Sequence, residues 1–247
     1  MFNVIRTKIN QGFQSIADIK GALPPDKFRG LLKITDGQCA NACYRCMEAC
    51  PAAAITYNPI TIDLSKCILC PECSRVCMDG IIRFSNQTDL ASTDLKDMII
   101  SSTHREPEIV PDNRIVKLFN KSFKLRSVSA GGCNGCELEL TALSNVNYDI
   151  GRFGIEFVTS PRHADGLVLT GPLTKNMAYA FEETYRAIPE PKVVILVGTC
   201  ALSGGIFTNS KAIDRTFLDK IKPNLYITGC PPHPLTVAKA LLKFIGR

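Results

Sequence analysis

Residues 67–77 of this 247-residue chain read CILCPECSRVC, so that four cysteines are separated by two, two and three residues. A second run, CANACYRCMEAC at residues 39–50, has the same spacing apart from one additional residue in its first gap. Each run is followed by a short stretch of strand-forming residues, at 54–57 and at 81–84. The two runs therefore form an internal repeat, and they predict a small domain over residues 36–85.

Cysteine is the most informative residue type in the composition. The chain contains 12 cysteines, and they divide into three groups of four with none left over. Disulfide scaffolds are typical of short secreted chains, whereas this sequence begins with neither an apolar leader and cleavage site nor a twin-arginine pair. We therefore expect a cytoplasmic protein in which the cysteines bind metal at three four-ligand sites.

The rest of the composition excludes several classes of protein. Hydrophobic residues make up 45% of the chain and charged residues 21%, as in a globular protein. The longest apolar run, at residues 193–197, is far shorter than the roughly 20 residues of a transmembrane helix. The net charge of +6 is spread evenly and is not gathered in a basic stripe with aromatic residues. The chain therefore does not have the pattern of a nucleic-acid-binding protein.

The spacing at residues 67–77 is the one with which bacterial ferredoxin loops bind 4Fe–4S clusters, where three thiolates bind one cluster and the fourth binds its neighbour. Applied to both runs, this crossing predicts two sites. The first site comprises Cys39, Cys43, Cys46 and Cys77, and the second comprises Cys67, Cys70, Cys73 and Cys50. Zinc is the alternative, but a zinc site generally uses two well-separated cysteine pairs.

From residue 122 onward the sequence alternates between strand and helix patterns, which predicts a parallel sheet with its ligands at the carboxyl ends of the strands. Strands are expected at 123–128, 155–159, 166–169, 193–197 and 225–228, and helices at 137–144, 175–187 and 234–244. Cys133, Cys200 and Cys230 each follow one of these strands. We therefore expect their loops to converge on one edge of the sheet and to form a third site with Cys136.

Characteristic motifs surround the four dispersed cysteines: GGCNGCE at residues 131–137, SPRHAD at 160–165, CALSGG at 200–205 and GCPP at 229–232. With these motifs, residues 123–247 resemble the small subunit of nickel–iron hydrogenases and the 20 kDa cluster subunit of complex I. Complex I subunits have two adjacent cysteines where this chain has two residues between them, as hydrogenases do. The resemblance is therefore greatest to the energy-converting, formate-hydrogenlyase-like group, and it implies an α/β flavodoxin-like domain with a parallel sheet.

The N-terminal part resembles the two-cluster ferredoxin subunits of complex I and of membrane-bound hydrogenases, both in its cysteine runs and in the KFRG lead-in at residues 27–30. This resemblance implies an α+β ferredoxin-like domain with two 4Fe–4S clusters at residues 36–85, fused to the hydrogenase-like domain at 123–247. Residues 86–122, which are rich in polar residues and proline, are expected to form a linker with a short helix near 95–100.

Residues 1–35 are interpreted as an amphipathic lead-in. Apolar residues recur three or four positions apart, which predicts a helix over residues 1–20 that is ended by the prolines at 24 and 25. Arg6, Lys8 and Lys20 lie on or near its polar side. Three roles are open for this helix: it lies on a membrane surface, it binds in a groove of a partner subunit, or it packs on the ferredoxin-like domain.

Together, the resemblances imply an iron–sulfur electron-transfer subunit of a multisubunit nickel–iron hydrogenase, an oxidoreductase. Its three 4Fe–4S clusters would relay electrons between a nickel–iron centre in a partner large subunit and a low-potential donor or acceptor, either ferredoxin or a formate-oxidising module. Such a subunit is cytoplasmic, or peripheral on the cytoplasmic membrane face through its complex. Two alternatives are a subunit of a nickel-free, complex I-like oxidoreductase that reduces quinone or another acceptor, and a freestanding electron carrier.

Several residues near the third site are candidates for further roles. Glu137 directly follows Cys136, and we expect it to relay protons, although a carboxylate at a helix N-terminus is also stabilised by the helix dipole. Glu139 is expected to lie on another face of the helix and to lack this role. Residues expected to surround the cluster are Gly132, Arg162, His163, Gly204 and Gly205. The alternatives are tight turns for the glycines and a turn cap or subunit contact around Arg162 and Asp165, while His104 and His233 are expected to have packing or surface roles.

Overall fold

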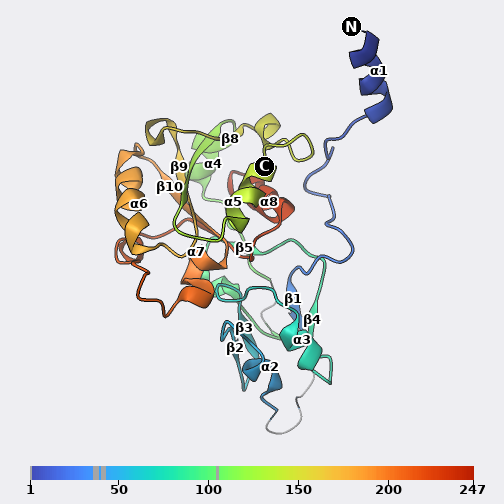
Figure 1. The fold of residues 1–247 in the computed structure, drawn as a ribbon, viewed down its shortest axis with the longest axis vertical. Helices are drawn as coiled ribbons and strands as arrows, with labels where there is room; N and C mark the ends of the chain where they lie inside the picture. The colour runs from blue at the N-terminus through green and yellow to red at the C-terminus, as the bar shows by residue number, and fades with distance from the viewer. Residues whose placement is uncertain (1, 36–38, 40–42, 104–105) are drawn as a thin grey trace.

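Strand β7 (Phe123–Ser129) is an interior strand of a six-stranded sheet in the computed structural model of the chain, which describes residues 2–35, 39, 43–103 and 106–247 (Figure 1). The strand order is β5-β11-β10-β9-β7-β8, and every pair except β5–β11 is parallel. The other strands are β5 (Ala91–Ser92), β8 (Ile155–Phe157), β9 (Gly166–Thr170), β10 (Val193–Val197) and β11 (Leu225–Ile227). The five parallel strands have the order 2-1-3-4-5, which is the flavodoxin-like arrangement that the resemblance implied.

Helices cover both faces of this sheet, and the sequence of the central strands reflects this. All five residues of β9 and all five of β10 are buried, as expected for strands with a helix layer on each side. Alternate strand residues pack with α6 on one face and with α5 and α8 on the other. The larger helices are α5 (Gly135–Ala142), α6 (Lys175–Ala187) and α8 (Pro234–Phe244), and the short helical segments are α7 (Thr199–Ser203), η2 (Ile150–Phe153), η3 (Pro161–His163), η4 (Gly205–Phe207) and η5 (Leu218–Lys220).

The N-terminal cysteine runs fold into a smaller α+β unit beneath this sheet in Figure 1. Strands β1 (Leu32–Ile34) and β4 (Ile82–Phe84) form an antiparallel pair. Strands β2 (Ile55–Thr56), β3 (Thr61–Asp63) and β6 (Ile99–Ile100) form a three-stranded antiparallel sheet. Each cysteine run contains one short helix, α2 (Arg45–Glu48) in the first and α3 (Glu72–Val76) in the second. The repeat seen in the sequence is therefore also present in the secondary structure.

Residues 86–122, expected to be a linker, carry more regular structure than their composition indicated. Strand β5 lies at the edge of the large sheet beside β11, and β6 pairs with β3 in the small sheet. The expected short helix is the 3₁₀ helix η1 (Leu95–Met98), whose first turn is capped by the Asp94 carboxylate. Helix α4 (Asn113–Phe119) follows, capped in the same way by Asp112. The segment therefore joins the two units by contributing a strand to each.

The N-terminal helix α1 (Phe2–Gln11) is half as long as the sequence pattern predicted. It ends before Gly12, which has a positive φ of 61° and so breaks the helix well ahead of the prolines. None of its residues is buried, so of the three roles left open for this helix the structure does not show packing on the cysteine-rich unit. Ile16 and Ile19, which belong to the same apolar pattern, instead pack in the core of the C-terminal domain.

Candidate metal sites

The structure brings the four dispersed cysteines together at the carboxyl edge of the large sheet. Cys133 follows β7, Cys136 begins α5, Cys200 lies in α7 directly after β10, and Cys230 follows β11. Burial, and then the charges of Glu137 and the other three cysteines, raises the pKa of Cys136 to about 12. Burial, and then Cys230 and Cys133, raises the pKa of Cys200 to about 11. Cys133 and Cys230 are exposed, so this third site opens onto the protein surface.

The structure places Cys77 beside the first cysteine run and not with its own. Cys39, Cys43, Cys46 and Cys77 line one cavity of about 450 Å³. Burial raises the pKa of the Cys46 thiol, and Cys39 and Cys77 raise it further. These four cysteines are the set that the crossed ligand pattern predicted for the first site.

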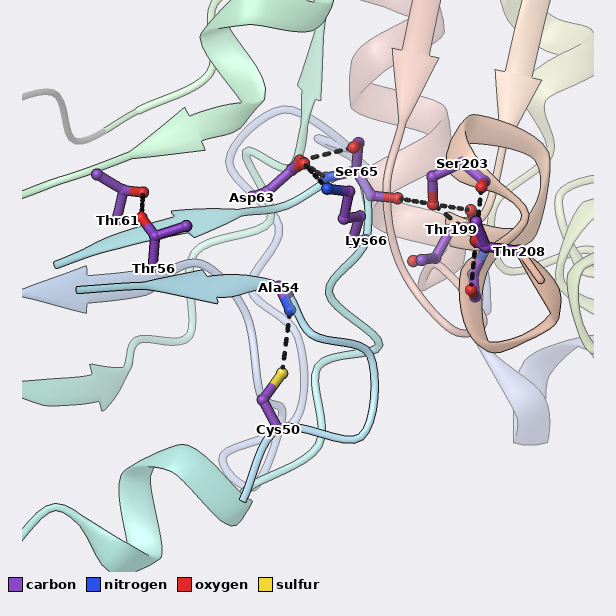
Figure 2. A network of polar contacts seen from close by, with 11 residues as sticks. Cys50, Ala54, Thr56, Thr61, Asp63, Ser65, Lys66, Thr199, Ser203 and Thr208 are labelled. Atoms are coloured by element: carbon purple, nitrogen blue, oxygen red, sulfur yellow. Dashed lines mark hydrogen bonds and ion pairs between the residues drawn. The ribbon is translucent and has the colours of Figure 1, made fainter. Parts of the chain in front are cut away.

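Cys50 lies in turn beside the second run. Burial raises the pKa of Cys67 to about 12, and the charges of Cys73, Cys50 and Cys70 act in the same direction against a hydrogen bond from the backbone N–H of Leu69. Cys50 and Cys77 have equivalent surroundings. The Cys50 Sγ accepts a hydrogen bond from the N–H of Ala54 at 3.3 Å (Figure 2), and the Cys77 Sγ accepts one from the N–H of Ile81 at 3.2 Å. In each case the donor lies four residues after the cysteine.

These three sets of thiols suit iron–sulfur clusters better than single metal ions. A lone zinc ion holds four sulfurs at about 2.3 Å from its centre. In the described part of the chain, no group of three or more His, Cys, Asp or Glu side chains has the spacing to hold a single metal ion. A cluster occupies more space between its four thiolates, and all-cysteine ligation with backbone N–H groups directed at sulfur is the environment that it requires.

Three hydroxyl groups join the second site to the third. The Ser203 hydroxyl donates to the Ser65 carbonyl at 2.8 Å (Figure 2). The Thr199 hydroxyl donates to the Cys67 carbonyl at 2.8 Å. The Thr228 hydroxyl donates to the Leu64 carbonyl beside them, and both threonines are buried. The loop that begins the second run is thereby held against the loops of Cys200 and Cys230. The charge of Cys46 in the first site raises the pKa of Cys73 in the second, so these two sites are also neighbours. The three sites therefore follow one another in the order third, second, first.

Glu137 lies at the carboxyl ends of the neighbouring strands β7 and β9. The order of the strands in the sheet reverses between these two strands. One of its carboxylate oxygens, Oε1, accepts hydrogen bonds from the Ser129 hydroxyl at 2.6 Å and from the Thr170 hydroxyl at 2.7 Å. The carboxylate is half-buried, and its negative charge raises the pKa of Cys136. It is therefore held by side chains of the sheet, and its position does not depend on capping the helix.

Glu139 lies on another face of α5, as expected, but its surroundings also touch the third site. Burial raises its pKa. It lines a cavity of about 300 Å³ between the two units, together with Cys230, His233, Lys27 and Arg29. His233 has the expected packing role, since it lies edge-on to Phe28 and its Nδ1 accepts a hydrogen bond from the N–H of Leu235. His104 lies outside the described residues.

The candidate glycines have different surroundings. A Cβ atom on Gly205 would lie 3.2 Å from the Cys200 sulfur, whereas one on Gly132 would lie 3.1 Å from the Cα of Gly171. Gly204 has a φ of +88° and ends α7. Gly205 therefore leaves room at a thiol, while Gly132 allows two loops to approach and Gly204 serves a turn.

Arg162 and His163 lie in η3, which packs beside β7 and α6. Within the described residues, neither side chain forms a hydrogen bond or ion pair. The Asp165 carboxylate accepts a hydrogen bond from the N–H of Lys124 in β7 at 2.7 Å. It therefore joins its loop to a strand 41 residues earlier in the chain and does not make the expected turn cap.

Sequence reasoning did not single out Thr199, Ser203 or Thr228. Thr228 directly follows the apolar strand β11, and Thr199 begins α7 two residues after the apolar strand β10 ends, so both lie beside the cysteine loops. A buried hydroxyl needs a hydrogen-bond partner, so these positions carried a signal that another segment would approach them. The sequence did not indicate which segment that is.

The fold and the cysteine positions define a class of protein: an α/β subunit with a four-cysteine site at the sheet edge that opens to the surface. Residues 133–244 match the NADH ubiquinone oxidoreductase 20 kDa subunit family, and the chain belongs to this family. An uncharacterised protein of Methanocaldococcus jannaschii is 43% identical over 129 residues, which are 51% of this chain and 86% of the relative. The predicted relationship to the complex I 20 kDa subunit is confirmed.

Two named relatives belong to hydrogenase complexes. A probable membrane-bound hydrogenase subunit (mbhJ) of Pyrococcus furiosus is 38% identical over 122 residues, covering 49% of this chain and 72% of the relative. Formate hydrogenlyase subunit 7 of Escherichia coli is 42% identical over 133 residues, covering 53% of this chain and 52% of the relative. This chain is therefore a subunit of an oxidoreductase complex, as expected.

Among solved structures, a chain of the membrane-bound sulfane sulfur reductase, an archaeal respiratory membrane complex, is similar, with 34% identity and a TM-score of 0.45. The match covers 53% of this chain and 75% of that chain. None of the helices formed by the described residues of the present protein is long and apolar enough to span a bilayer.

Proposed function

We propose that this chain is the electron-transfer subunit of a nickel–iron hydrogenase complex and that it binds three 4Fe–4S clusters. The observation that carries the proposal is the arrangement of all 12 cysteines in three sets of four, of which the outermost is exposed at Cys133 and Cys230. Residues 36–85 form the ferredoxin-like domain with two of the clusters, and residues 123–247 hold the third. When bound, such clusters supply one-electron transfer at low potential.

The residues of the chain do three things in this proposal. The thiols bind the clusters, and because burial keeps the pKa of Cys67 and Cys136 near 12, ligation at neutral pH releases their protons. The N–H groups of Ala54 and Ile81 donate to ligand sulfurs and stabilise their negative charge. Gly205 leaves room beside the Cys200 sulfur, and Gly132, Gly204, Arg162 and His163 shape the surroundings of the third site.

The exposed third site would face the large subunit that holds the nickel–iron centre. The first site, at the other end of the series, would exchange electrons with a low-potential donor or acceptor such as ferredoxin or a formate-oxidising module. Glu137 is proposed to carry protons at the large-subunit interface, since its carboxylate lies beside Cys136 and is held in place by hydrogen bonds from two hydroxyl groups. We infer that the whole assembly is peripheral on the cytoplasmic face of the membrane.

Iron and acid-labile sulfide analysis of the anaerobically purified chain tests the cluster count. Three clusters predict about 12 iron atoms per chain, and about eight would show that one of the three sites is wrong. Purification with the native partner tests the hydrogenase assignment. A large subunit with two Cys-x-x-Cys pairs and bound nickel is expected.

The second candidate is a nickel-free, complex I-like oxidoreductase, which the family match favours. The two residues between Cys133 and Cys136 argue for hydrogenase instead. A large subunit that lacks the cysteine pairs and nickel, in a complex that reduces quinone, would replace the hydrogenase assignment with this one.

A further inference from the structure

Helix α1 is an amphipathic helix that contacts no core of its own chain. Phe2 is 89% exposed, Ile9 is 74% exposed, and Phe13, just beyond the helix, is 96% exposed. The other three helices of eight or more residues in the described part of the chain each bury at least one apolar side chain. In Figure 1, α1 projects away from the rest of the molecule. Its apolar side chains are therefore not packed against the described part of the chain.

The distribution of side chains around α1 is that of a helix that lies at an interface. At about 100° per residue, Phe2, Ile5 and Ile9 fall within an arc of roughly 60°. Arg6 and Lys8 lie on opposite sides of this apolar stripe, and the helix contains no acidic residue. Val4 lies roughly 130° from the centre of the stripe, so its exposed side chain belongs to another face.

The stripe faces away from the body of the protein. A hollow between α1 and the body is lined on the helix side by Asn3, Val4, Thr7, Lys8 and Gln11 and on the body side by Val146. Lys8 thus lies at the border between this face and the stripe. Phe2, Ile5 and Ile9 do not line it. The helix thus turns its polar face and Val4 toward the protein and presents the stripe outward.

The segment that follows α1 is fixed to the C-terminal domain. Ile19 is buried in the core of that domain, and the Ile16 N–H donates to the Asn147 carbonyl at 2.8 Å. The Arg152 guanidinium donates to the Ile16 carbonyl, and the Lys239 ammonium donates to the Ala22 carbonyl at 2.8 Å. These contacts hold the segment that follows the helix against the C-terminal domain.

We propose that α1 binds the surface of an anionic phospholipid bilayer, with Phe2, Ile5 and Ile9 in the acyl boundary and Arg6 and Lys8 at the phosphate groups. Apolar residues flanked on both sides by cations complement a layer of anionic headgroups over an apolar interior. A helix of ten residues binds such a surface weakly by itself. It would therefore orient a complex that other subunits bring to the membrane.

Vesicle flotation of the cluster-loaded full-length chain tests this proposal. We expect at least about tenfold more binding to vesicles of phosphatidylglycerol and phosphatidylcholine than to phosphatidylcholine alone. Ile9→Gln removes one apolar side chain of the stripe and is expected to weaken binding about tenfold or more. Val4→Gln is the matched control, since it makes an equivalent change on the same helix outside the stripe, and it should change binding less than about twofold.

The charges are tested with Arg6→Gln and Lys8→Gln, each of which is expected to weaken binding to the anionic vesicles about fivefold at low salt. Equal binding to both vesicle types, or equal effects of Ile9→Gln and Val4→Gln, would overturn the proposal. Failure to bind either vesicle type, with loss of a partner subunit from the Ile9→Gln complex, would identify a protein groove as the occupant instead. Cluster absorbance of each variant reports folding, and the outcome is independent of the cluster count and of the partner's metal.

Discussion

The cysteine runs and the sheet edge bring four thiols together in different ways. In each run, four cysteines fall within 11 or 12 residues, so most of each proposed site is local and one cysteine of each run is expected to belong to the other run's site. At the sheet edge, Cys200 and Cys230 come from separate strand–loop units, and only Cys133 and Cys136 are close in the sequence. The first kind of site depends on spacing and the second on strand order. The edge site is also the more open, which suits contact with another subunit.

The largest expected effect comes from removing a ligand of the edge site. Cys230→Ala should lower the iron content from about 12 to about eight atoms per chain and abolish electron transfer to or from the large subunit. The signals of the two run sites should persist, because their ligands are independent of Cys230. Electron paramagnetic resonance together with iron analysis checks this, and loss of all cluster signals would show that the two kinds of site do not form separately.

Cys77→Ser tests the exchange of ligands between the runs. We expect it to perturb the cluster of Cys39, Cys43 and Cys46 and to leave that of Cys67, Cys70 and Cys73 intact, because Cys77 lines the cavity of the first site. Cys50→Ser is the matched variant and should have the opposite effect. If the resonance spectra show that each variant loses the cluster of the run that contains the substituted cysteine, the exchange of ligands between the runs is wrong.

Glu137→Gln removes the proposed proton carrier at the edge site and keeps the size of the side chain. We expect H₂ turnover of the assembled complex to fall about 100-fold, at the lower end of the effect of losing a positioned acid or base, with an unchanged iron content. Glu139 is unsuitable as a control because it lines a cavity beside Cys230. Glu156, which is exposed on β8, serves instead, and Glu156→Gln should leave turnover normal. Normal turnover in Glu137→Gln would assign this carboxylate a structural role.

Thr199→Val removes one of the hydrogen bonds that join the second site, in the cysteine runs, to the third site at the sheet edge. It leaves the Cys67 carbonyl without this donor in a buried position, and we expect a loss of about 1–3 kcal/mol in stability. The magnetic interaction between the second and third clusters should weaken as well. Thr199→Ser keeps the hydroxyl and should restore both properties. Thr208→Val is the control, because the Thr208 hydroxyl bonds only within its own loop, to the Ser203 and Gly205 carbonyls. Equal stability losses in Thr199→Val and Thr208→Val would contradict the bridging role.

The smallest expected effect concerns the stability of the metal-free protein, which should depend on pH through its buried thiols but change little near pH 7. Burial raises the pKa of Cys67 in the folded chain from 9.0 to about 12. The folded state therefore binds this proton more tightly than the unfolded state does, and its contribution to stability is complete below about pH 9. It is lost as the pH rises from about 9 toward 12. Urea midpoints of the chelator-treated protein should fall over this range, and the fall should be shallower in Cys67→Ala. A flat profile in the unaltered protein would show that the thiol is not buried.

Local sequence patterns predicted most of the individual elements. Hydrophobic runs such as residues 193–197 became the buried strands, because a strand between two helix layers needs apolar residues on both faces. Helix α6 has the predicted limits, and the expected carboxyl-edge position of Cys133, Cys200 and Cys230 follows from a rule of parallel sheets. These are local properties, set by spacing and periodicity.

The tertiary structure decided what those elements meet. The sequence could not show that Thr199 would bond to Cys67, 132 residues away in the chain, because this contact depends on how two separately folded units dock. Nor could it show that residues 86–122 would supply a strand to each sheet, since two-residue strands have no pattern of their own. Helix α1 ends at Gln11 although the apolar spacing continues, because Gly12 has a positive φ and because Ile16 and Ile19 pack in the core of the C-terminal domain. Spacing along the chain determines local shape, whereas long-range neighbours depend on the packing of the whole.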